Sequence, residues 1–193
     1  MSTSIITRTG ELSMKEPIIP SKRGETQTFS MTRRTPLALD ESAAITNIDN
    51  LNQLLADTIT LRDLYKKHHW QASGAMFYMM HLLYDKHFDG QSELVDLVAE
   101  RVQTLGGVTI AMAADVAEAT LIPRAPKGRE NTETQVARLL HAHEVILLEA
   151  RSMARESNAN GDFGTNDIIV SDVIRTNELQ AWFLSEHIQS AEF

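Results

Sequence analysis

Cysteine is absent from this sequence of 193 residues. Its absence excludes disulfide bonds, thiolate nucleophiles and zinc sites built on sulfur, and it fits a reducing compartment. Long hydrophobic runs are absent too, because the most apolar stretch, residues 75–84, contains His81 and is far shorter than the roughly 20 residues that cross a bilayer. The N-terminal residues lack the long apolar core of a signal peptide. We therefore expect a cytoplasmic protein that does not contact a membrane.

The sequence also lacks the alternation of apolar and polar residues that marks β-strands, and it has no internal repeat and no glycine-rich phosphate loop. Apolar residues instead recur at steps of three and four, which predicts helices. Four long helices are expected, over residues 40–72, 75–104, 132–156 and 165–187. Residues 108–130 connect the second helix to the third, and their first half is expected to form a short helix before Pro123 and Pro126. The fold class is therefore all-α: a four-helix bundle over residues 40–193, with a long crossover that carries a short helix.

Particular residues mark the expected helix ends. The glycine pair at residues 106–107 follows the second helix, and glycine is common just past a helix C-terminus. Thr132 with Gln135 resembles a capping box at the start of the third helix. Thr165 or Asn166 is the expected N-cap of the fourth helix.

Residues 1–39 are rich in serine, threonine, proline and charge and show no apolar period, which predicts a flexible tail. They hold six basic and three acidic residues, a net charge of +3, although the whole chain carries −8. The remaining residues therefore carry −11, so the body repels nucleic acid and attracts cations. The basic residues of the tail are Arg8, Lys15, Lys22, Arg23, Arg33 and Arg34. Two alternatives stay open for the tail: a solubilising segment, or an arm that binds the phosphates of DNA.

Two pairs of metal-ligand residue types lie on the second expected helix, His81 with Asp85 and Asp96 with Glu100. With His81 placed at 0° on a helical wheel, the other three fall at about 40°, 60° and 100°, so all four point to one side. Imidazole nitrogens and carboxylate oxygens together suit iron, manganese or zinc. Any one of these residues is more often merely solvated or packed, so the argument for a metal rests on the constellation.

The distance between the two pairs limits how they can act. Asp85 and Asp96 lie about 16 Å apart along a continuous helix, whereas metal–ligand bonds are about 2 Å long. Either the helix breaks near residues 89–90, or two chains share the site about a two-fold axis. Bundles that hold two irons inside one chain use Glu-x-x-His on two helices, and no glutamate here has a histidine three residues later. The sequence therefore favours a site shared between chains.

From about residue 40 to 190 the chain resembles the Dps family, the mini-ferritins named for DNA protection in starved cells. The resemblance rests on His69-Trp70, His81-x-x-x-Asp85, Asp96-x-x-x-Glu100-Arg101 and Leu105-Gly106-Gly107, which match the order and spacing of the family's inter-subunit ferroxidase motif. The segment GDFGTND also resembles the acidic pore segment of the family, in which Asp162 and Asp167 fall on pore positions. Ser171 stands where some members have a third acid, which implies a weaker attraction for cations.

The resemblance implies a ferritin-like bundle assembled as a hollow dodecamer that binds Fe²⁺, oxidises it with O₂ or, preferentially, hydrogen peroxide, and stores ferric mineral inside. By matching position, one subunit supplies His69, His81 and Asp85 to each mono-iron or di-iron site. The two-fold partner supplies its copies of Asp96 and Glu100. Trp70 is expected either beside the site, where it intercepts radicals, or as a core aromatic. Zinc is a competing occupant.

Three functions remain as hypotheses. The first is a ferroxidase and iron store that protects the cell from oxidative damage. The second is a DNA-binding protein of the nucleoid that acts through its basic tail. The third is a structural cage with a degraded or zinc-occupied site, against which the intact ligand set argues. A further pair, His141 and His143, resembles a surface metal clip, but a packed or solvated pair is the favoured interpretation.

Overall fold

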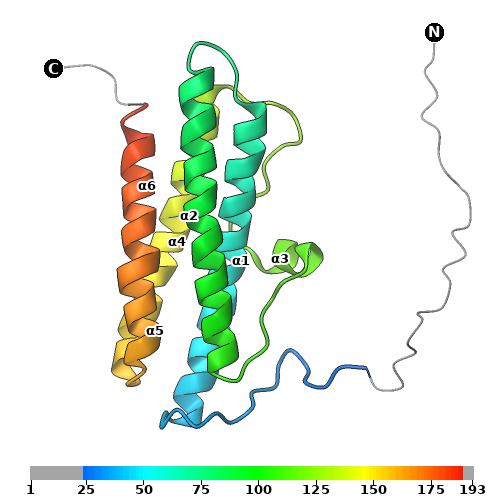
Figure 1. Ribbon diagram of the computed structural model, residues 1–193, viewed down its shortest axis with the longest axis vertical. Coiled ribbons are helices and arrows are strands. Elements are labelled where there is room, and N and C mark those ends of the chain that lie inside the picture. The colour runs from blue at the N-terminus through cyan, green and yellow to red at the C-terminus, as the bar shows by residue number, and fades with distance from the viewer. Residues whose placement is uncertain (1–23, 189–193) are drawn as a thin grey trace, which may run out of the picture.

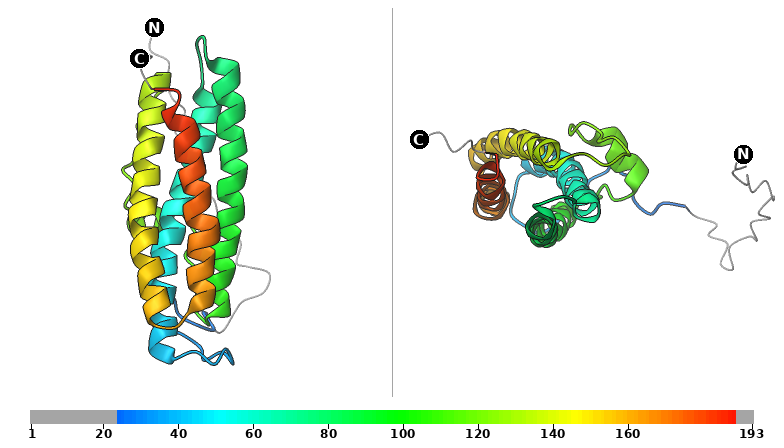
Figure 2. Two further views of the ribbon diagram at one scale, coloured as in Figure 1. Left: turned by 90° about the vertical axis from the view of Figure 1, so that its left-hand side faces the viewer. Right: turned by 90° about the horizontal axis from the view of Figure 1, so that it is seen from above.

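The structure, a computed structural model, describes residues 24–188 (Figures 1 and 2). Four long helical segments run side by side, and no β-strand occurs in this part of the chain. They are α1 (Glu41–Gln71), α2 (Phe77–Thr104), α4 (Thr132–Ala159), and a last segment made of α5 (Phe163–Asp167), η1 (Ile168–Ile174) and α6 (Arg175–Ser185). The expected all-α four-helix bundle is confirmed. None of these helices combines the length and apolar character that crossing a bilayer requires within residues 24–188.

The core lies between the four segments because each turns an apolar stripe inward. Side chains from all four are fully enclosed, among them Leu51, Val98, Leu139, Ile146, Ile169 and Leu184. α2 ends at the opposite end of the bundle from the start of α4, so the connection between them must return along the whole bundle (Figure 1). It carries the short helix α3 (Ala113–Ala119), which lies beside α1. The short helix expected in the crossover is therefore confirmed.

Asp57 of α1 holds the crossover in place. This carboxylate is fully buried, and its Oδ1 accepts hydrogen bonds from Leu121 N at 2.7 Å and Thr120 Oγ1 at 2.6 Å. Its Oδ2 accepts from Gln53 Nε2 at 2.7 Å. Buried carboxylates require such donors, because an unpaired one would carry a large desolvation cost.

The starts of two helices differ from the expectations by one to four residues. Asn131, rather than Thr132, caps α4, because its side chain accepts a hydrogen bond from Thr134 N at 2.8 Å. The last segment begins at α5 with Asp162 as its N-cap, whose carboxylate accepts from Thr165 N at 3.0 Å. Thr165 and Asn166 lie inside that helix. Its continuation through a π-helical turn, η1, has no counterpart in the apolar period of the sequence.

The glycine pair after α2 ends the helix as expected. Gly106 N donates to Gln103 O and Gly107 N donates to Val102 O, both at 3.0 Å, and Gly106 has a φ of 92°. These two bonds form a Schellman motif, which requires a left-handed residue after the last helical turn.

Residues 24–39 lie along the bundle end rather than apart from it. Arg33 N and Gln27 Nε2 both donate to the carbonyl oxygen of Gly106, each at 2.9 Å. The flexible tail expected over residues 1–39 is therefore held by hydrogen bonds in this second part, where Arg33 and Arg34 remain exposed. The other basic residues of the expected tail, Arg8, Lys15, Lys22 and Arg23, lie outside the described residues.

Gly106→Ala is expected to lower the free energy of unfolding by more than about 1 kcal/mol, because alanine is strained at a positive φ. An added Cβ would also clash with the backbone oxygen of Arg33, so residues 24–39 should become sensitive to proteolysis. Chemical denaturation and limited trypsin digestion measure the two effects. Gly128→Ala is the matched control, since nothing lies within 4 Å of its added Cβ; equal stability of the two variants would contradict this role of Gly106.

Candidate metal centre

His69 in the last turn of α1 and His81 near the start of α2 form the first part of the candidate site. Their rings stack with centroids 3.7 Å apart and 20° between the planes. His69 Nδ1 donates to the carbonyl oxygen of His81 at 2.8 Å, and His81 Nδ1 donates to that of His69 at 3.0 Å. A carbonyl oxygen only accepts, so both Nδ1 atoms carry a proton. In the neutral rings Nε2 therefore carries the lone pair that a metal ion binds.

Asp85 lies one turn after His81 and adds a carboxylate to the pair. Its Oδ1 is 3.7 Å from His69 Nδ1 and accepts a hydrogen bond from Lys66 Nζ at 2.5 Å. The ammonium of Lys66 also lies 4.4 Å from the centroid of the Phe88 ring. The hydrogen bond from Lys66 lowers the pKa of Asp85, and the nearby imidazoles act in the same direction. Asp85 is therefore ionised at neutral pH, and the ammonium of Lys66 is hydrogen-bonded to one of its oxygens.

Lys66→Met is expected to tighten metal binding at this half of the site about two- to fivefold, because an incoming cation would no longer displace the ammonium. The factor is small because both side chains are partly exposed, and such ion pairs contribute at most about 1 kcal/mol. Anaerobic calorimetry with Fe²⁺ measures it. Lys67→Met, which removes a cation that lies 3.9 Å from Glu130 instead, is the control. Weaker binding by Lys66→Met would show that Lys66 supports the carboxylate rather than competing for it.

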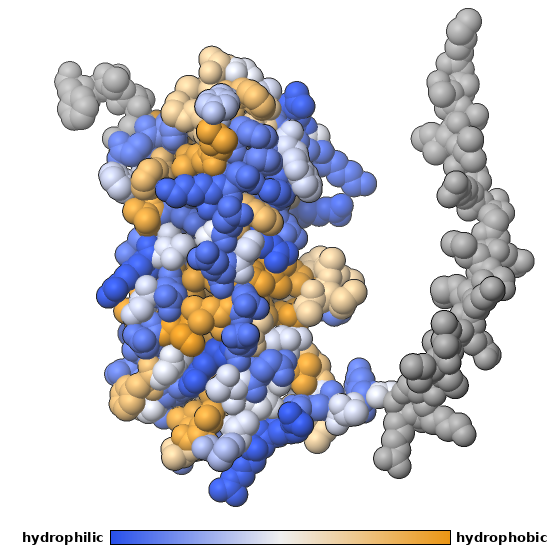
Figure 3. All heavy atoms as spheres, in the orientation of Figure 1, coloured by the Kyte–Doolittle hydropathy of each residue, from blue (hydrophilic) through white to orange (hydrophobic). Residues whose placement is uncertain are grey.

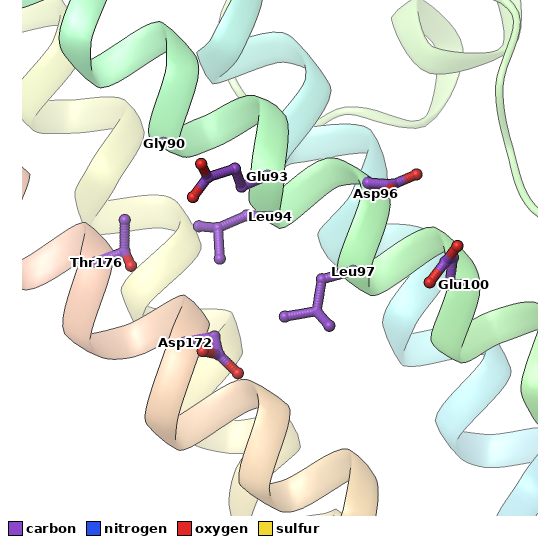
Figure 4. A pocket seen from close by; sticks show the side chains of 8 residues that line it. All are labelled: Gly90, Glu93, Leu94, Asp96, Leu97, Glu100, Asp172 and Thr176. Carbon is purple, nitrogen blue, oxygen red and sulfur yellow. The ribbon is translucent and has the colours of Figure 1, made fainter.

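Asp96 and Glu100 form the second part of the candidate site. Both are exposed on α2 and line a hollow of about 410 Å³ between α2 and the last helical segment (Figure 4). Glu93 and Asp172 line the same hollow. Four carboxylates around one hollow produce a negative potential that raises the local concentration of cations.

α2 is continuous through Gly90, so one chain does not bring the two parts together. Asp85 and Asp96 are separated by about 16 Å along the axis of an unbroken helix. Within residues 24–188 no three or more histidine, aspartate or glutamate side chains are placed to hold one metal ion. The alternative of a helix broken at residues 89–90 is therefore excluded. Each chain carries two separate halves, a histidine half with Asp85 and a carboxylate half.

Trp70 belongs to an exposed apolar surface next to the histidine half. This surface consists of Trp70, Phe77, Tyr78, Met79 and Leu82, which are 45–72% exposed. Figure 3 shows apolar side chains at the end of the bundle where α1 passes into α2. Trp70 itself is 71% exposed, so it is not a core aromatic of its own chain. Large exposed apolar patches are typical of protein–protein contact sites.

Asp162 does not have the pore position that its sequence context suggested. It is 3% exposed, and its carboxylate accepts hydrogen bonds from Arg101 Nη2 at 2.6 Å and Asn47 Nδ2 at 2.9 Å, besides those from Thr165. All of its acceptor capacity is used inside the subunit, so no oxygen is free for a passing cation. Asp167 is exposed and accepts from Ser171 Oγ at 2.8 Å; its pore role stays a prediction.

Sequence reasoning missed two features of this region. Lys66 gave a usable signal, since it precedes His69 by three residues and therefore lies on the same face of α1. The other feature is a buried hydrogen-bond network around Tyr65, which joins His87 of α2 and His143 of α4. Its members are far apart in the sequence, and each resembles an ordinary core residue. His143 is fully buried, so the interpretation of His141 and His143 as something other than a surface metal clip is supported.

The comparisons with known proteins agree with this geometry. A family model described as a ferritin-like domain matches residues 48–193. An uncharacterized protein from Kitasatospora aureofaciens is 43% identical over 147 residues, which cover 76% of this chain and 98% of that protein. The nutrient stress-induced DNA-binding protein of a Nostoc species is 30% identical over 152 residues, covering 79% of this chain and 83% of that protein.

Solved structures with a similar fold also match this chain. DpsC from Streptomyces coelicolor is 49% identical, with a TM-score of 0.86 and coverage of 88% of this chain and 99% of that one. An archaeal Dps homologue from Halobacterium salinarum has the same fold, with a TM-score of 0.85 at 24% identity and coverage of 89% and 96%. The chain therefore belongs to the ferritin-like family and, within it, to the Dps proteins.

Proposed function

We propose that this protein is a cytoplasmic mini-ferritin that binds Fe²⁺ at sites shared between two subunits, oxidises it and stores the ferric product inside a hollow dodecamer. One observation carries the proposal: the reciprocal hydrogen bonds of His69 and His81 fix both Nδ1 protons and leave both Nε2 atoms for a metal. Asp85 adds an ionised carboxylate to the same place. The remaining ligands, Asp96 and Glu100, come from a second chain.

The ligand set suits the oxidation of ferrous iron. Carboxylates stabilise the ion as its charge rises from Fe²⁺ to Fe³⁺, and a small number of neutral nitrogens leaves coordination positions for the oxidant. Hydrogen peroxide is the preferred oxidant in this proposal. One peroxide takes one electron from each of two Fe²⁺ ions and, with two protons, leaves as two water molecules. This route releases no hydroxyl radical, which is why it would protect the cell.

The exposed apolar surface supports assembly about a two-fold axis. It adjoins the histidine half, so a partner that covers Trp70 and Phe77 would stand close to His69 and His81. An antiparallel pairing would set the histidine half of each chain against the carboxylate half of the other and give two equivalent sites. That such dimers close into a dodecamer is inferred from the Dps group to which the chain belongs. In that shell Asp167 would line the route of Fe²⁺ entry, and zinc would compete for the shared sites.

The proposal is tested by loading the protein anaerobically with Fe²⁺ and then adding hydrogen peroxide. We expect ferric absorbance to appear with about one peroxide consumed per two Fe²⁺, and electron microscopy to show mineral inside a spherical shell. Sedimentation should find an assembly much larger than the 21.6 kDa chain. A monomer at micromolar concentration, or ferric iron that forms only as precipitate outside the protein, would contradict the proposal.

DNA binding is a second candidate function, favoured by the exposed arginines Arg33 and Arg34 and by the DNA-binding description of the Nostoc relative. Deleting residues 1–23 removes four further basic residues and leaves the hydrogen bonds of residues 24–39 in place. If the tail binds DNA, this deletion should weaken binding and flatten its salt dependence, since each phosphate contact contributes about 0.9 to the slope of log K against log salt.

Gel retardation at several salt concentrations makes the measurement, and Fe²⁺ oxidation by the same deletion is the control. We expect oxidation to be unchanged. Full retention of DNA binding would show that residues 1–23 are not the DNA-binding segment.

A further inference from the structure

Apolar side chains are exposed at both ends of α1, which lie at opposite ends of the bundle (Figure 1). The exposed apolar surface that contains Trp70 is at the end where α1 passes into α2. At the other end is the α1 groove, a hollow of about 520 Å³ between residues 29–32, the first turns of α1 and the crossover. Its apolar lining consists of Phe29, Ile45, Ile48, Ile110 and Ala119. Phe29 is 54% and Ile45 is 42% exposed, so a single chain leaves this groove uncovered.

The segment before α1 builds one wall of the α1 groove. A turn closed by the hydrogen bond from Met31 N to Thr28 O, at 3.0 Å, carries Phe29. The side chain of Gln27 fastens this turn to the bundle, because its Nε2 lies 2.6 Å from Met31 O and 2.9 Å from Gly106 O. The wall is therefore held by hydrogen bonds, although it belongs to no helix.

The proposed shared site determines how far the exposed apolar surface lies from the two-fold axis. An axis that brings the histidine half of one chain to the carboxylate half of the other must cross α2 midway between them, between residues 90 and 91. Trp70 follows His69, whose ring stacks on that of His81, so Trp70 lies near the level of residue 80 of α2. With a rise of about 1.5 Å per residue, Trp70 is about 16 Å from the level of the axis.

The α1 groove lies equally far on the other side of the axis. Ile48 is at the level of Val102, because a Cβ added at Gly107 would lie 2.7 Å from Ile48 Cγ2 and 3.0 Å from Val102 Cγ1. Asp49 is therefore near the level of residue 101 of α2, about 16 Å from the level of the axis. The rotation that pairs the two halves of the site thus also brings Trp70 of one chain to the level of the partner's Asp49.

Trp70 and the groove residues of α1 point to the same side of that helix. With Trp70 placed at 0° on a helical wheel, Ile45 falls at about 20°, Ile48 at about −40° and Asp49 at about 60°. Two antiparallel copies of α1 that meet along this side therefore set the indole of each chain against the groove of the other.

The polar lining of the α1 groove supplies an acceptor for the indole N–H. Asn52 is already engaged, because its Nδ2 donates to Val108 O and its Oδ1 accepts from Ile110 N. Asp49 lines the same groove, is exposed, and takes part in no side-chain hydrogen bond within residues 24–188. The N–H of a buried indole usually finds such an acceptor.

We propose that Trp70 of each subunit docks in the α1 groove of its two-fold partner, so that the segment before α1 in one chain positions the histidine half of the other. The proposal rests on the proposed two-fold site. In this contact the indole packs between the partner's Phe29 and the partner's Ile48, and its N–H donates to the partner's Asp49. Burying one tryptophan removes about 150–250 Å² from water, and each dimer has two such contacts. Because His69 directly precedes Trp70, the groove also fixes the place of a proposed iron ligand.

The absence of cysteine from the chain makes a direct test possible. In the double variant Trp70→Cys with Asp49→Cys, the two thiols of one chain are separated by about 32 Å along α1, which a short bismaleimide cannot bridge. The reagent, added as the subunits assemble, should therefore produce covalent dimers on denaturing gels. The control variant Trp70→Cys with Leu148→Cys, whose second site is exposed on α4, should produce none.

The single variant Asp89→Cys separates this proposal from the proposed function. Asp89 is exposed and lies within two residues of the level of the axis, so its thiol should cross-link to its own copy in the partner. Covalent dimers from Asp89→Cys but none from the variant with cysteines at positions 70 and 49 would overturn the docking of Trp70 and leave the shared site standing. No dimers from either variant would contradict the two-fold pairing, and the docking with it.

A second measurement keeps Trp70 in place. The chain has two tryptophans, so Trp182→Phe leaves Trp70 as the single fluorophore of this kind. Its emission should move to shorter wavelength as the subunits assemble, because the groove removes the indole from water. In this background Phe29→Ala, which opens the wall of the groove, should return the emission of the assembled protein toward longer wavelength and increase its quenching by acrylamide.

Met31→Ala is the matched control, because Met31 is exposed in the same turn and does not line the groove. It should leave the emission of the assembled protein unchanged. An assembled Phe29→Ala variant whose emission is also unchanged would overturn the positioning role of the segment before α1.

Discussion

The variant in which His69 and His81 are both replaced by alanine is expected to oxidise Fe²⁺ at least about 100-fold more slowly than the unaltered protein. Loss of groups that merely orient metal ligands costs 10- to 100-fold, and here the ligands themselves are lost. The variant Asp96→Ala with Glu100→Ala should show a loss of similar size, although it leaves the histidine pair untouched. Both losses are measured as initial rates of ferric absorbance after peroxide is added.

Residues of the same types outside the candidate site provide the controls. His141→Ala with His187→Ala removes two histidines outside the candidate site, and Asp115→Ala with Glu118→Ala removes two exposed carboxylates on α3. We expect both control variants to oxidise Fe²⁺ within about twofold of the unaltered rate. A carboxylate variant that kept its full rate would remove Asp96 and Glu100 from the site and leave the histidine half to act alone.

Asp162→Ala is expected to lower the free energy of unfolding by about 3–5 kcal/mol, which is typical when one partner of a buried ion pair is removed. Arg101 would be left without its partner at 2.6 Å, and α5 would lose its N-cap. Asp167→Ala, five residues later and exposed, should change stability by less than about 0.5 kcal/mol. Denaturant titrations at one fixed protein concentration make the comparison, because assembly contributes to stability. Similar unfolding midpoints for the two variants would contradict the assignment of Asp162 to a buried ion pair.

The fold could be predicted because helical periodicity and glycine ends are local signals. The helix expected over residues 75–104 agrees with α2 to within two residues at its start, since its core stripe recurs within the segment and Gly106 allows the left-handed turn. The metal-ligand pairs could also be recognised in the sequence, because residues four apart on one helix share a face. The sequence left open whether α2 continues through Gly90.

Roles that depend on distant partners could not be predicted. The carboxylate of Asp162 pairs with Arg101 and Asn47, 61 and 115 residues away in the sequence, so its acidic context alone suggested a pore. Residues 24–39 are held mainly by the carbonyl oxygen of Gly106, and a backbone acceptor has no sequence signature. Tyr65 and His143 are likewise recognisable as a pair only after α1 and α4 have packed together.

The central claim, that two chains share each site, is tested most directly by mixing two inactive variants. One carries His69→Ala and His81→Ala, and the other carries Asp96→Ala and Glu100→Ala. After dissociation, equal mixing and reassembly, about half of the two-fold dimers should contain one chain of each kind. In a mixed dimer one site receives histidines from the second variant and carboxylates from the first, so it is complete, while the other site lacks both.

Fe²⁺ oxidation by the reassembled mixture is therefore expected to recover to about a quarter of the unaltered rate if pairing is random. Mass spectrometry of the dimers confirms that subunits have exchanged. A mixture that exchanged fully but remained as inactive as its two parents would contradict the shared site.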